Sequence, residues 1–331
     1  MPRHCSITVI VVNWNAGHWL AKTVSALRRQ TFAGFRVIIV DNASTDDSLA
    51  LALDAWPAVE ILAQEKNLGF AVANNLAVRY TDSEWIALLN PDAAPEEDWL
   101  ARLFSAARDN PDFQFFGSRQ LMADDPERLD GIGDAYHVSG LAWRVGHGDR
   151  DTPEDRQTRE IFAPCAAAAF YRRDAFLQVG GFDPGFFCYL EDVDLGFRLR
   201  LAGFRALYVP DAVVAHAGSA ITGRMSDFTV YHSQRNLVWV FFKNMPGKLF
   251  WRYLPIHLLL NIWAIVRFAL RDQGMVVLRA KRDALRGLPG VLRGRARIQS
   301  ARKVGAESIS RLLVHGWPRR PSAADVGRGQ P

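Results

Sequence analysis

The sequence predicts an α/β fold in which a doubly wound, mostly parallel sheet is followed by a C-terminal helical segment. The first observation is the alternation, over residues 7–89, of apolar runs of strand length with stretches of helical periodicity. Such alternation gives parallel strands with helices on both faces of the sheet. The second observation is a change of character after about residue 230. We expect one domain over 1–235 and amphipathic helices with a basic tail over 236–331.

Four apolar runs, rich in β-branched residues, are predicted as strands. They span 7–12, 37–40, 59–62 and 85–89. Between the first two, Leu20 and Leu27 fall on one face of a predicted helix, and another helix is expected over 70–80. Ser44, with Asp47 three residues later, resembles a capping box for the helix that follows the second strand.

Beyond the fourth strand the alternation is less regular. The segment 123–159 is polar and rich in Gly and Asp, and we expect a long mobile insertion there. Strand character returns at 161–171 and again at 205–209. A helix is predicted over 191–202 and is expected to end at Gly203, because glycine readily adopts the left-handed conformation that closes a helix.

The composition is that of an ordinary globular protein. Hydrophobic residues make up 49% of the chain and charged residues 23%, which excludes a disordered chain. Cys5, Cys165 and Cys188 are odd in number and widely spaced, so they form neither a metal motif nor a disulfide framework. We interpret them as reduced, mostly structural thiols of a cytosolic protein. The N-terminal residues lead directly into the first strand, and no signal peptide is expected.

Polar residues follow each of the four predicted strands. They are Asn13 and Asn15, Asp41 and Asn42, Asn67, and Asn90 and Asp92, in strand order. Ligands of open α/β sheets bind beyond the carboxyl ends of the strands. The sequence therefore predicts a binding site at this edge of the sheet.

Three segments together resemble family 2 glycosyltransferases with the A-type fold, and among these the rhamnosyltransferase-type members. The segments are 40–46 (VDNASTD), 67–70 (NLGF) with Asn74 and Asn75 on to 90–93 (NPDA), and 180–183 (GGFD) with 189–195 (YLEDVDL) and His216. The resemblance covers roughly residues 6–235. It implies inverting transfer of a sugar, rhamnose or another hexose, from a UDP- or dTDP-sugar to a lipid-linked or polysaccharide acceptor in cell-envelope glycan synthesis.

The resemblance places Asp41 against the pyrimidine ring and ribose of the donor. A carboxylate at a strand's end accepts hydrogen bonds from a ring N–H or a ribose hydroxyl, although a turn or helix-cap Asp is the alternative. The remaining donor-binding candidates are Asn13, Asn15, Asn42, Asn67, Gly69, Asn74 and Asn90. Arg235 is a further candidate, because a planar guanidinium suits phosphate oxygens; a membrane-surface contact is its alternative.

A divalent cation, Mn²⁺ or Mg²⁺, is implied by the same resemblance. The family usually carries Asp-x-Asp where this chain has Asn90-Pro91-Asp92, so one carboxylate is missing. One Asp suffices where substrate phosphates complete the coordination. His216 is the second implied ligand, and an imidazole suits Mn²⁺ better than Mg²⁺. The alternatives are an Asn-Pro-Asp turn and a structural His.

Glu191, Asp192 and Asp194 form an acidic cluster at the start of the helix predicted over 191–202. Inverting transfer needs one base for the proton of the acceptor hydroxyl. The resemblance implies Asp192 as this base, with Glu191 second and Asp194 ordering the site. Plain compensation of the helix dipole is the alternative.

The C-terminal segment has two apolar runs, 237–242 and 254–266, and each falls short of the roughly 20 residues of a spanning helix. Trp251 and Trp263 favour the bilayer interface. Fourteen Lys and Arg against three acidic residues lie between positions 267 and 320. We expect helices in the headgroup region of an anionic membrane, with the protein peripheral on the cytoplasmic face of the cytoplasmic membrane. Helices packed on the core or on a partner chain are the alternative.

Two other classes of protein were weighed. A catalytically impaired nucleotide-sugar-binding protein is admitted by Asn90 in place of Asp. A nucleic-acid-binding protein would rest on the basic tail alone, and the chain has no motif of that class, so no nucleic-acid partner is expected. Homo-oligomerisation stays open.

Overall fold

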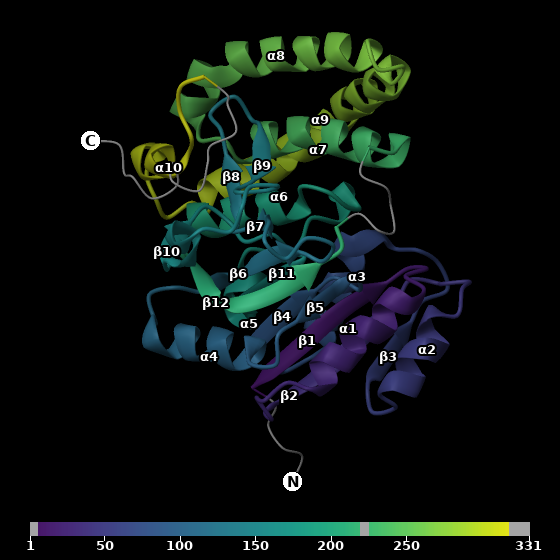
Figure 1. Ribbon diagram of the computed structural model, residues 1–331. Helices are drawn as coiled ribbons and strands as arrows, with labels where there is room; N and C mark the ends of the chain where they lie inside the picture. The colour runs from purple at the N-terminus through teal and green to yellow at the C-terminus, as the bar shows by residue number, and fades with distance from the viewer. Residues whose placement is uncertain (1–5, 219–224, 318–331) are drawn as a thin grey trace.

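The computed structural model describes residues 6–218 and 225–317 and is built on a ten-stranded sheet (Figure 1). The strand order is β10-β12-β6-β11-β4-β1-β2-β3, with β5 paired to β12 and β7 to β6. The N-terminal strands are β1 (Ile7–Asn13), β2 (Phe35–Asp41), β3 (Glu60–Ala63) and β4 (Trp85–Leu89). They lie where the sequence predicts strands, and all pair in parallel.

In this parallel part of the sheet, the side chains of each strand alternate between the two faces. Val9 and Val11 of β1 pack with Leu20 of α1 (His18–Arg28) on one face. Ile10 packs with Ala73 of α3 (Gly69–Tyr80) on the other. The period of two in the strands and the apolar faces of the helices therefore produce the predicted doubly wound arrangement.

Beyond β4 the sheet is mixed. The strands here are β5 (Ala93–Pro95), β6 (Phe115–Met122), β10 (Arg159–Ile161), β11 (Ala168–Arg172) and β12 (Ala206–His216). β11 runs antiparallel to both β4 and β6, whereas β12 is parallel to β6. The single strand expected at 161–171 is thus two short strands in different places. The strand expected at 205–209 continues to His216, which brings that residue opposite Ala93 of β5.

The expected mobile insertion at 123–159 is wrong, because this segment is ordered and contributes to the core. It contains β7 (Leu129–Gly131), β8 (Asp134–Tyr136), β9 (Ala142–Arg144) and the 3-10 turn η1 (Pro153–Arg156). Ile132 and Tyr136 are buried in the hydrophobic core. The acidic residues that suggested a solvated loop, such as Asp130 and Asp134, are buried as well. The glycines serve tight turns instead, as Gly133 does with φ of 112°.

Helices cover the sheet and form a separate layer above it (Figure 1). The remaining ones are α2 (Ser48–Ala55), α4 (Trp99–Asp109), α5 (Arg173–Gln178), the 3-10 turn η2 (Pro184–Phe186), α6 (Glu191–Leu201), α7 (Asp227–Asn244), α8 (Gly247–Ala269), α9 (Gly274–Ser300) and α10 (Ala306–Leu312). α6 ends before Gly203, as predicted, with φ of 90° at that glycine. The boundary expected between 235 and 236 falls inside α7.

The basic segment is largely a helix packed on the protein. Ala280 and Ala284 of α9 are buried, and the indole of Trp239 on α7 donates to the Ala284 carbonyl over 3.0 Å. The Lys281 ammonium donates to the Gln234 carbonyl of α7 over 2.7 Å. This is the packed arrangement that the sequence left as an alternative. Arg319 and Arg320 lie outside the described residues.

The C-terminal apolar runs were expected to be too short to span a membrane, and for α8 that is wrong. α8 is one continuous helix of 23 residues that is long and apolar enough to cross a membrane by length and composition. His257 and Asn261 do not interrupt its apolar surface, because they turn toward the protein. The Nδ1 atom of His257 lies 2.8 Å from the Ser139 carbonyl oxygen, and Asn261 bonds back to His257.

Candidate active site

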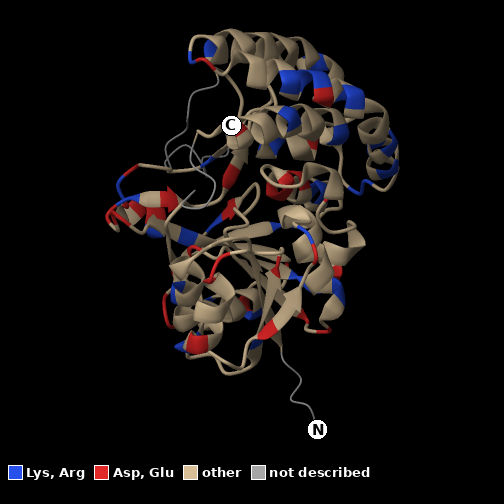
Figure 2. Ribbon diagram, turned by 90° about the vertical axis from the view of Figure 1, so that its right-hand side faces the viewer, with Lys and Arg blue, Asp and Glu red and all other residues tan. Residues whose placement is uncertain are grey.

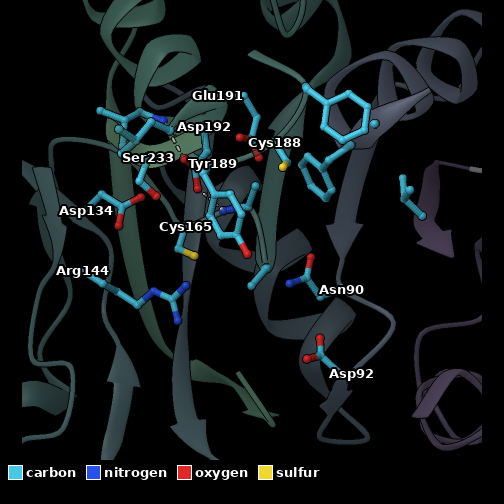
Figure 3. A pocket seen from close by; sticks show the side chains of 18 of the residues that line it. Asn90, Asp92, Asp134, Arg144, Cys165, Cys188, Tyr189, Glu191, Asp192 and Ser233 are labelled. Atoms are coloured by element: carbon cyan, nitrogen blue, oxygen red, sulfur yellow. Dashed lines mark hydrogen bonds between the residues drawn. The ribbon is translucent and has the colours of Figure 1, made fainter. Parts of the chain in front are cut away.

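A cavity of about 520 Å³ lies at the carboxyl ends of β1 and β4 (Figure 3). Eight of the predicted site residues line it: Asn42, Asn67, Gly69, Asn90, Asp92, Glu191, Asp192 and His216. Five others do not: Asn13, Asn15, Asp41, Asn74 and Arg235. The strand-end rule therefore located the cavity, while individual residues at that edge differ in what they contact.

Asn13 and Asp41 hold the loop after β2. The Asn13 amide nitrogen donates to Oδ1 of Asp41 over 2.8 Å and lies 3.0 Å from Oγ of Ser44 and 2.9 Å from Oγ of Ser48. Asp41 Oδ2 accepts the Ser44 backbone N–H over 3.2 Å. The predicted capping box is wrong: α2 begins only at Ser48, and Ser44 bonds back to Asn13 and not to the helix.

Asn15 and Asn42 tie neighbouring loops together. Asn15 has φ of 51°, and its side-chain oxygen accepts the Thr45 N–H over 2.8 Å. Asn42 is buried and accepts the Leu68 N–H over 3.4 Å. These bonds fix the edge formed by the loops after β1, β2 and β3, next to the cavity.

Gly69 is required by its surroundings. Its φ is 78°, and a Cβ built there would lie 2.5 Å from the ring of Phe187. No residue with a side chain fits this close approach without moving the ring. Gly69 therefore shapes the cavity wall by admitting the aromatic ring of Phe187.

Two predicted donor-binding residues contact the protein instead of the cavity. Asn74 donates to the Phe70 carbonyl one turn earlier in α3, over 2.9 Å. Arg235 donates to the carbonyls of Gly185 and Phe186 over 3.0 and 2.8 Å, and it stacks on Trp239. Arg235 thus supports the loop that leads into α6.

That loop has an unusual backbone. Phe187, Tyr189 and Leu190 have φ of 66°, 66° and 64°. Such conformations cost on the order of 1–3 kcal/mol each and persist where the surroundings enforce them. The side-chain nitrogen of Asn236 donates to the carbonyls of Phe186, Cys188 and Tyr189 over 2.7–3.1 Å. This single amide therefore fixes the loop that presents the start of α6 to the cavity.

Asp92, Asn90 and His216 converge at the other side of the cavity. Nε2 of His216 lies 3.3 Å from Oδ1 of Asp92 and 3.2 Å from Nδ2 of Asn90. The Asp92 carbonyl accepts the Ala217 N–H over 3.0 Å, which holds the end of β12 beside β5. The Asp92 carboxylate and Nε2 of His216 thus meet at one point, and they are the oxygen and nitrogen donors that could bind Mn²⁺ there.

The other nitrogen of His216 bonds to Asp130. Nδ1 lies 2.7 Å from Oδ2 of Asp130, which also pairs with Arg144 and His147. Burial lowers the pKa of His216, but the bonds to Asp130 and Asp92 raise it by more, to about 9. Burial acts to raise the pKa of Asp130, yet Arg144 and the two His residues hold it well below its usual range. A carboxylate that accepts Nδ1–H fixes the imidazole with Nε2 facing the cavity.

Asp192 and Glu191 stand at the first turn of α6. Oδ2 of Asp192 accepts the Ala166 N–H over 3.0 Å, and Oδ1 accepts the Val193 N–H over 2.8 Å. Burial raises the pKa of Asp192 above its ordinary value despite these bonds. Burial and the Asp192 charge raise the pKa of Glu191 well above its usual range, and Oε2 of Glu191 has no hydrogen-bond partner among the described residues.

Asp194 points to the opposite side of α6. It is fully buried and pairs with Arg198, Lys243 and Asn244 over 2.8–2.9 Å. The bond to Lys243 joins α6 to α7. Asp194 therefore orders the helix that carries Asp192 and does not face the cavity.

Several cavity residues were missed by the sequence reasoning. They are Trp14, Asp134, Trp143, Arg144, Phe187, Tyr189 and Phe228. Asp134, Trp143 and Arg144 belong to the segment interpreted as an insertion, and the apolar residues that recur between its turn residues were the available signal. Cys165 and Cys188 also line the cavity. Burial raises the pKa of both thiols, which suits the inert, structural role expected of them. Cys5 lies outside the described residues.

The mixed sheet, with its cavity at the carboxyl ends of β1 and β4, matches solved structures of glycosyltransferases of the A-type fold. The profile of Glycosyl transferase family 2 matches residues 8–180, and the chain belongs to this family. Figure 1 shows the matched sheet below the C-terminal helical layer. The expectation of an enzyme is thus confirmed.

Comparison with individual proteins agrees with this membership. The chain is 30% identical over 248 residues to N-acetylglucosaminyl-diphospho-decaprenol L-rhamnosyltransferase of Mycobacterium tuberculosis, which covers 66% of this chain and 78% of that protein. It is 27% identical over 213 residues to the O-antigen chain rhamnosyltransferase RfbN of Salmonella typhimurium, covering 64% and 66%. The fold matches the mannosyltransferase PcManGT from Pyrobaculum calidifontis with a TM-score of 0.55 at 19% identity, over 89% of this chain and 85% of that one.

Proposed function

We propose that this glycosyltransferase moves rhamnose, or another hexose, from a dTDP- or UDP-sugar to a lipid-linked or polysaccharide acceptor in cell-envelope glycan synthesis. The observation that carries the proposal is the placement of Asp192 in one cavity with Asp92 and His216. A base and a diphosphate-binding group that face the same space are what direct displacement at a sugar carbon needs. The names of the two rhamnosyltransferase relatives support the sugar.

The donor is proposed to lie along the edge formed by Asn42, Asn67 and Asn90, with its diphosphate beside Asp92. Asn13, Asn15 and Asp41 support this edge through the bonds described above. Asp92 and His216 would hold a divalent cation, with Mn²⁺ favoured by the imidazole. That cation supplies charge neutralisation for the departing nucleoside diphosphate.

Asp192 is proposed as the base. Its carboxylate takes the proton of the acceptor hydroxyl while that oxygen forms a bond to the anomeric carbon. The bond from that carbon to the diphosphate oxygen breaks, and the electron pair leaves with the diphosphate. Attack opposite the leaving group inverts the anomeric centre. The N–H groups of Ala166 and Val193 fix the carboxylate, and its raised pKa makes it a stronger base than an exposed Asp.

The protein is proposed to be peripheral on the cytoplasmic face of the cytoplasmic membrane, bound through its C-terminal helices. Large apolar side chains are exposed along α8 and the start of α9: Trp251, Leu258, Leu259, Ile262, Trp263, Val266, Leu270 and Met275. Figure 2 shows Lys and Arg residues gathered on this helical layer at the top of the molecule. α8 packs against the basic α9, so a spanning α8 would carry charges of α9 toward the hydrocarbon. An interfacial position avoids that cost.

The test is transfer by the full chain from a panel of dTDP- and UDP-sugars to an N-acetylglucosaminyl-diphospho-polyprenol, with Mn²⁺ and with EDTA. We expect transfer from dTDP-rhamnose, an inverted anomeric centre in the product by NMR, and loss of activity in EDTA. Transfer from a UDP-sugar alone would assign a UDP-sugar as the donor in place of dTDP-rhamnose. Absence of transfer from every donor would overturn the proposed activity.

A further inference from the structure

The β8–β9 hairpin brings an acidic side chain to the cavity that has no assigned role. Asp134 opens β8 and faces Arg144 of β9 in the strand register. Its side chain lines the cavity and the residue is only 7% exposed. Figure 3 shows Asp134, Cys165 and Asp192 on one side of the cavity, with Asn90 and Asp92 across from them.

The carboxylate of Asp134 faces the cavity and bonds to no other described residue. Within the described residues it makes no hydrogen bond and no ion pair, because Arg144 bonds to Asp130 instead. A carboxylate that is only 7% exposed, borders the cavity and bonds to no protein group is available to a ligand that enters the cavity.

The position of this carboxylate relative to Asp192 indicates which ligand. One oxygen of Asp134, one of Asp192 and Sγ of Cys165 all lie within 4.8 Å of one another. Two acceptors this close can bind adjacent hydroxyls of one sugar ring. A cation is the less favourable occupant, because the Arg144 guanidinium already places a positive charge beside all three groups and burial keeps the Cys165 thiol protonated.

The hairpin lies across the cavity from the proposed donor edge. The donor edge is built by the loops after β1, β2 and β3, whereas Figure 1 shows β8 and β9 between the sheet and α8. The turn of the hairpin is held by the C-terminal region: the Ser139 carbonyl contacts His257 of α8 over 2.8 Å, and the Val138 N–H donates to the Val314 carbonyl over 3.0 Å. β8, which begins with Asp134, therefore lies on the side of the sheet where α8 would meet a membrane surface.

We propose that Asp134 binds the acceptor, accepting a hydrogen bond from a sugar hydroxyl adjacent to the one that Asp192 deprotonates. This inference rests on the proposed function and deepens it by assigning acceptor recognition to the β8–β9 hairpin. It makes Asp134 a specificity-determining residue. A site built to bond a hydroxyl rejects an analogue that lacks it, because the buried protein group is then left unpaired.

The test compares wild type and Asp134→Ala with N-acetylglucosaminyl-diphospho-polyprenol and with its 3-deoxy and 4-deoxy analogues, using whichever donor the panel above identifies. One analogue lacks the attacking hydroxyl and gives no product. The other analogue keeps the attacking hydroxyl. If it lacks the hydroxyl that bonds to Asp134, the kcat/KM of wild type for it should be at least 100-fold lower than for the full acceptor. If a third position is bonded instead, the 6-deoxy analogue shows this loss. Asp134→Ala should use the full acceptor and the analogue that lacks only the bonded hydroxyl within about threefold of each other, with an unchanged donor KM.

Two controls keep the outcome interpretable. Asp155→Ala removes a buried carboxylate of the same segment that bonds Thr152 away from the cavity, and it should retain the wild-type discrimination. Asp134→Asn should unfold at a temperature no lower than wild type, since burial raises the pKa of Asp134 and so disfavours its charged form, and the amide carries no charge.

Wild-type discrimination that persists in Asp134→Ala would overturn this assignment while the proposed function stands. A bound cation that Asp134→Ala loses, measured by elemental analysis of the purified protein, would overturn it in favour of a metal cluster with Asp192 and Cys165. No transfer by wild type from any donor would overturn the proposed function, and this assignment with it.

Discussion

The Nδ1 atom of His216 lies 2.7 Å from Oδ2 of Asp130, and the two residues are buried. Asp130 is 86 positions away in the sequence and belongs to a segment expected to be mobile. An imidazole oriented by a carboxylate in this way presents its other nitrogen to a metal, and here that nitrogen is 3.3 Å from Asp92. The sequence named both candidate ligands and missed the residue that orients one of them.

Asp130→Asn should weaken the affinity for Mn²⁺ without abolishing Mn²⁺ binding. Outer carboxylates of this kind change metal affinity by about 10- to 100-fold, so the Mn²⁺ concentration for half-maximal activity should rise by that factor. Direct Mn²⁺ binding, followed by electron paramagnetic resonance, should weaken in parallel. Asp92→Ala is the comparison and should also weaken binding of the nucleoside diphosphate. An unchanged Mn²⁺ titration in Asp130→Asn, or activity that persists in EDTA, would contradict the metal site.

Asp192→Asn should abolish transfer and leave donor binding nearly intact. The amide keeps the shape and one acceptor oxygen but takes no proton, so kcat should fall by about 10²- to 10⁴-fold. Single-turnover transfer and calorimetric titration with the nucleoside diphosphate measure the two effects separately. Glu191→Gln is the matched variant one residue earlier and should retain more activity. The reverse order of the two variants would assign the base to Glu191.

Asp194→Asn should destabilise the protein, whereas Asp192→Asn should not. The change leaves Lys243 and Arg198 buried with one partner fewer, and breaking a buried pair costs about 3–5 kcal/mol. Burial acts to raise the pKa of Asp194, but Arg198 and Lys243 lower it overall. Its contribution to stability is therefore present above the unfolded-state pKa and lost as the pH falls through the lower folded pKa. Urea unfolding at neutral pH checks the loss, and equal stability of the Asp192 and Asp194 variants would argue against it.

A double substitution on α8, Leu259→Ser with Trp263→Ser, should release the protein from vesicles that contain phosphatidylglycerol. The two side chains are 65% and 54% exposed, and burying such side chains in an apolar phase is worth about 1.5–3 kcal/mol each. A loss of roughly 3 kcal/mol is about 100-fold in partitioning. These substitutions are preferable to removal of the C-terminal segment, since α9 covers α7.

Tyr80→Ser is the control for that substitution, because Tyr80 is equally exposed, at 58%, but lies on α3. It should sediment with vesicles like wild type. High salt should loosen wild type without fully releasing it, since the apolar part of the interaction is not screened. Alkaline carbonate should extract a peripheral protein. Resistance to carbonate would indicate that α8 spans the bilayer.

The parallel half of the sheet could be read from the sequence because its signals are local. Each strand is an apolar run of β-branched residues, and each carries its polar residues directly after it. Motif spacing also placed Asn90, Asp92, Asp192 and His216, which the fold brings to one cavity. By contrast, Arg235 and Asn74 have the right chemistry and position in the chain, but their side chains turn to backbone carbonyls.

The sequence by itself determined the fold class, the edge of the sheet that holds the cavity and the acidic cluster at the start of α6, because periodicity and strand-end chemistry are carried by neighbouring residues. Only the tertiary structure decided that the β8–β9 hairpin is ordered, that Asp130 orients His216 and that Asp134 stands beside Asp192. It also decided that His257 and Asn261 face inward, which makes α8 one long apolar helix. These are contacts between distant segments. No local pattern records whether a polar side chain is solvated or buried against a partner 80 or more residues away, as for Asp130 and His216.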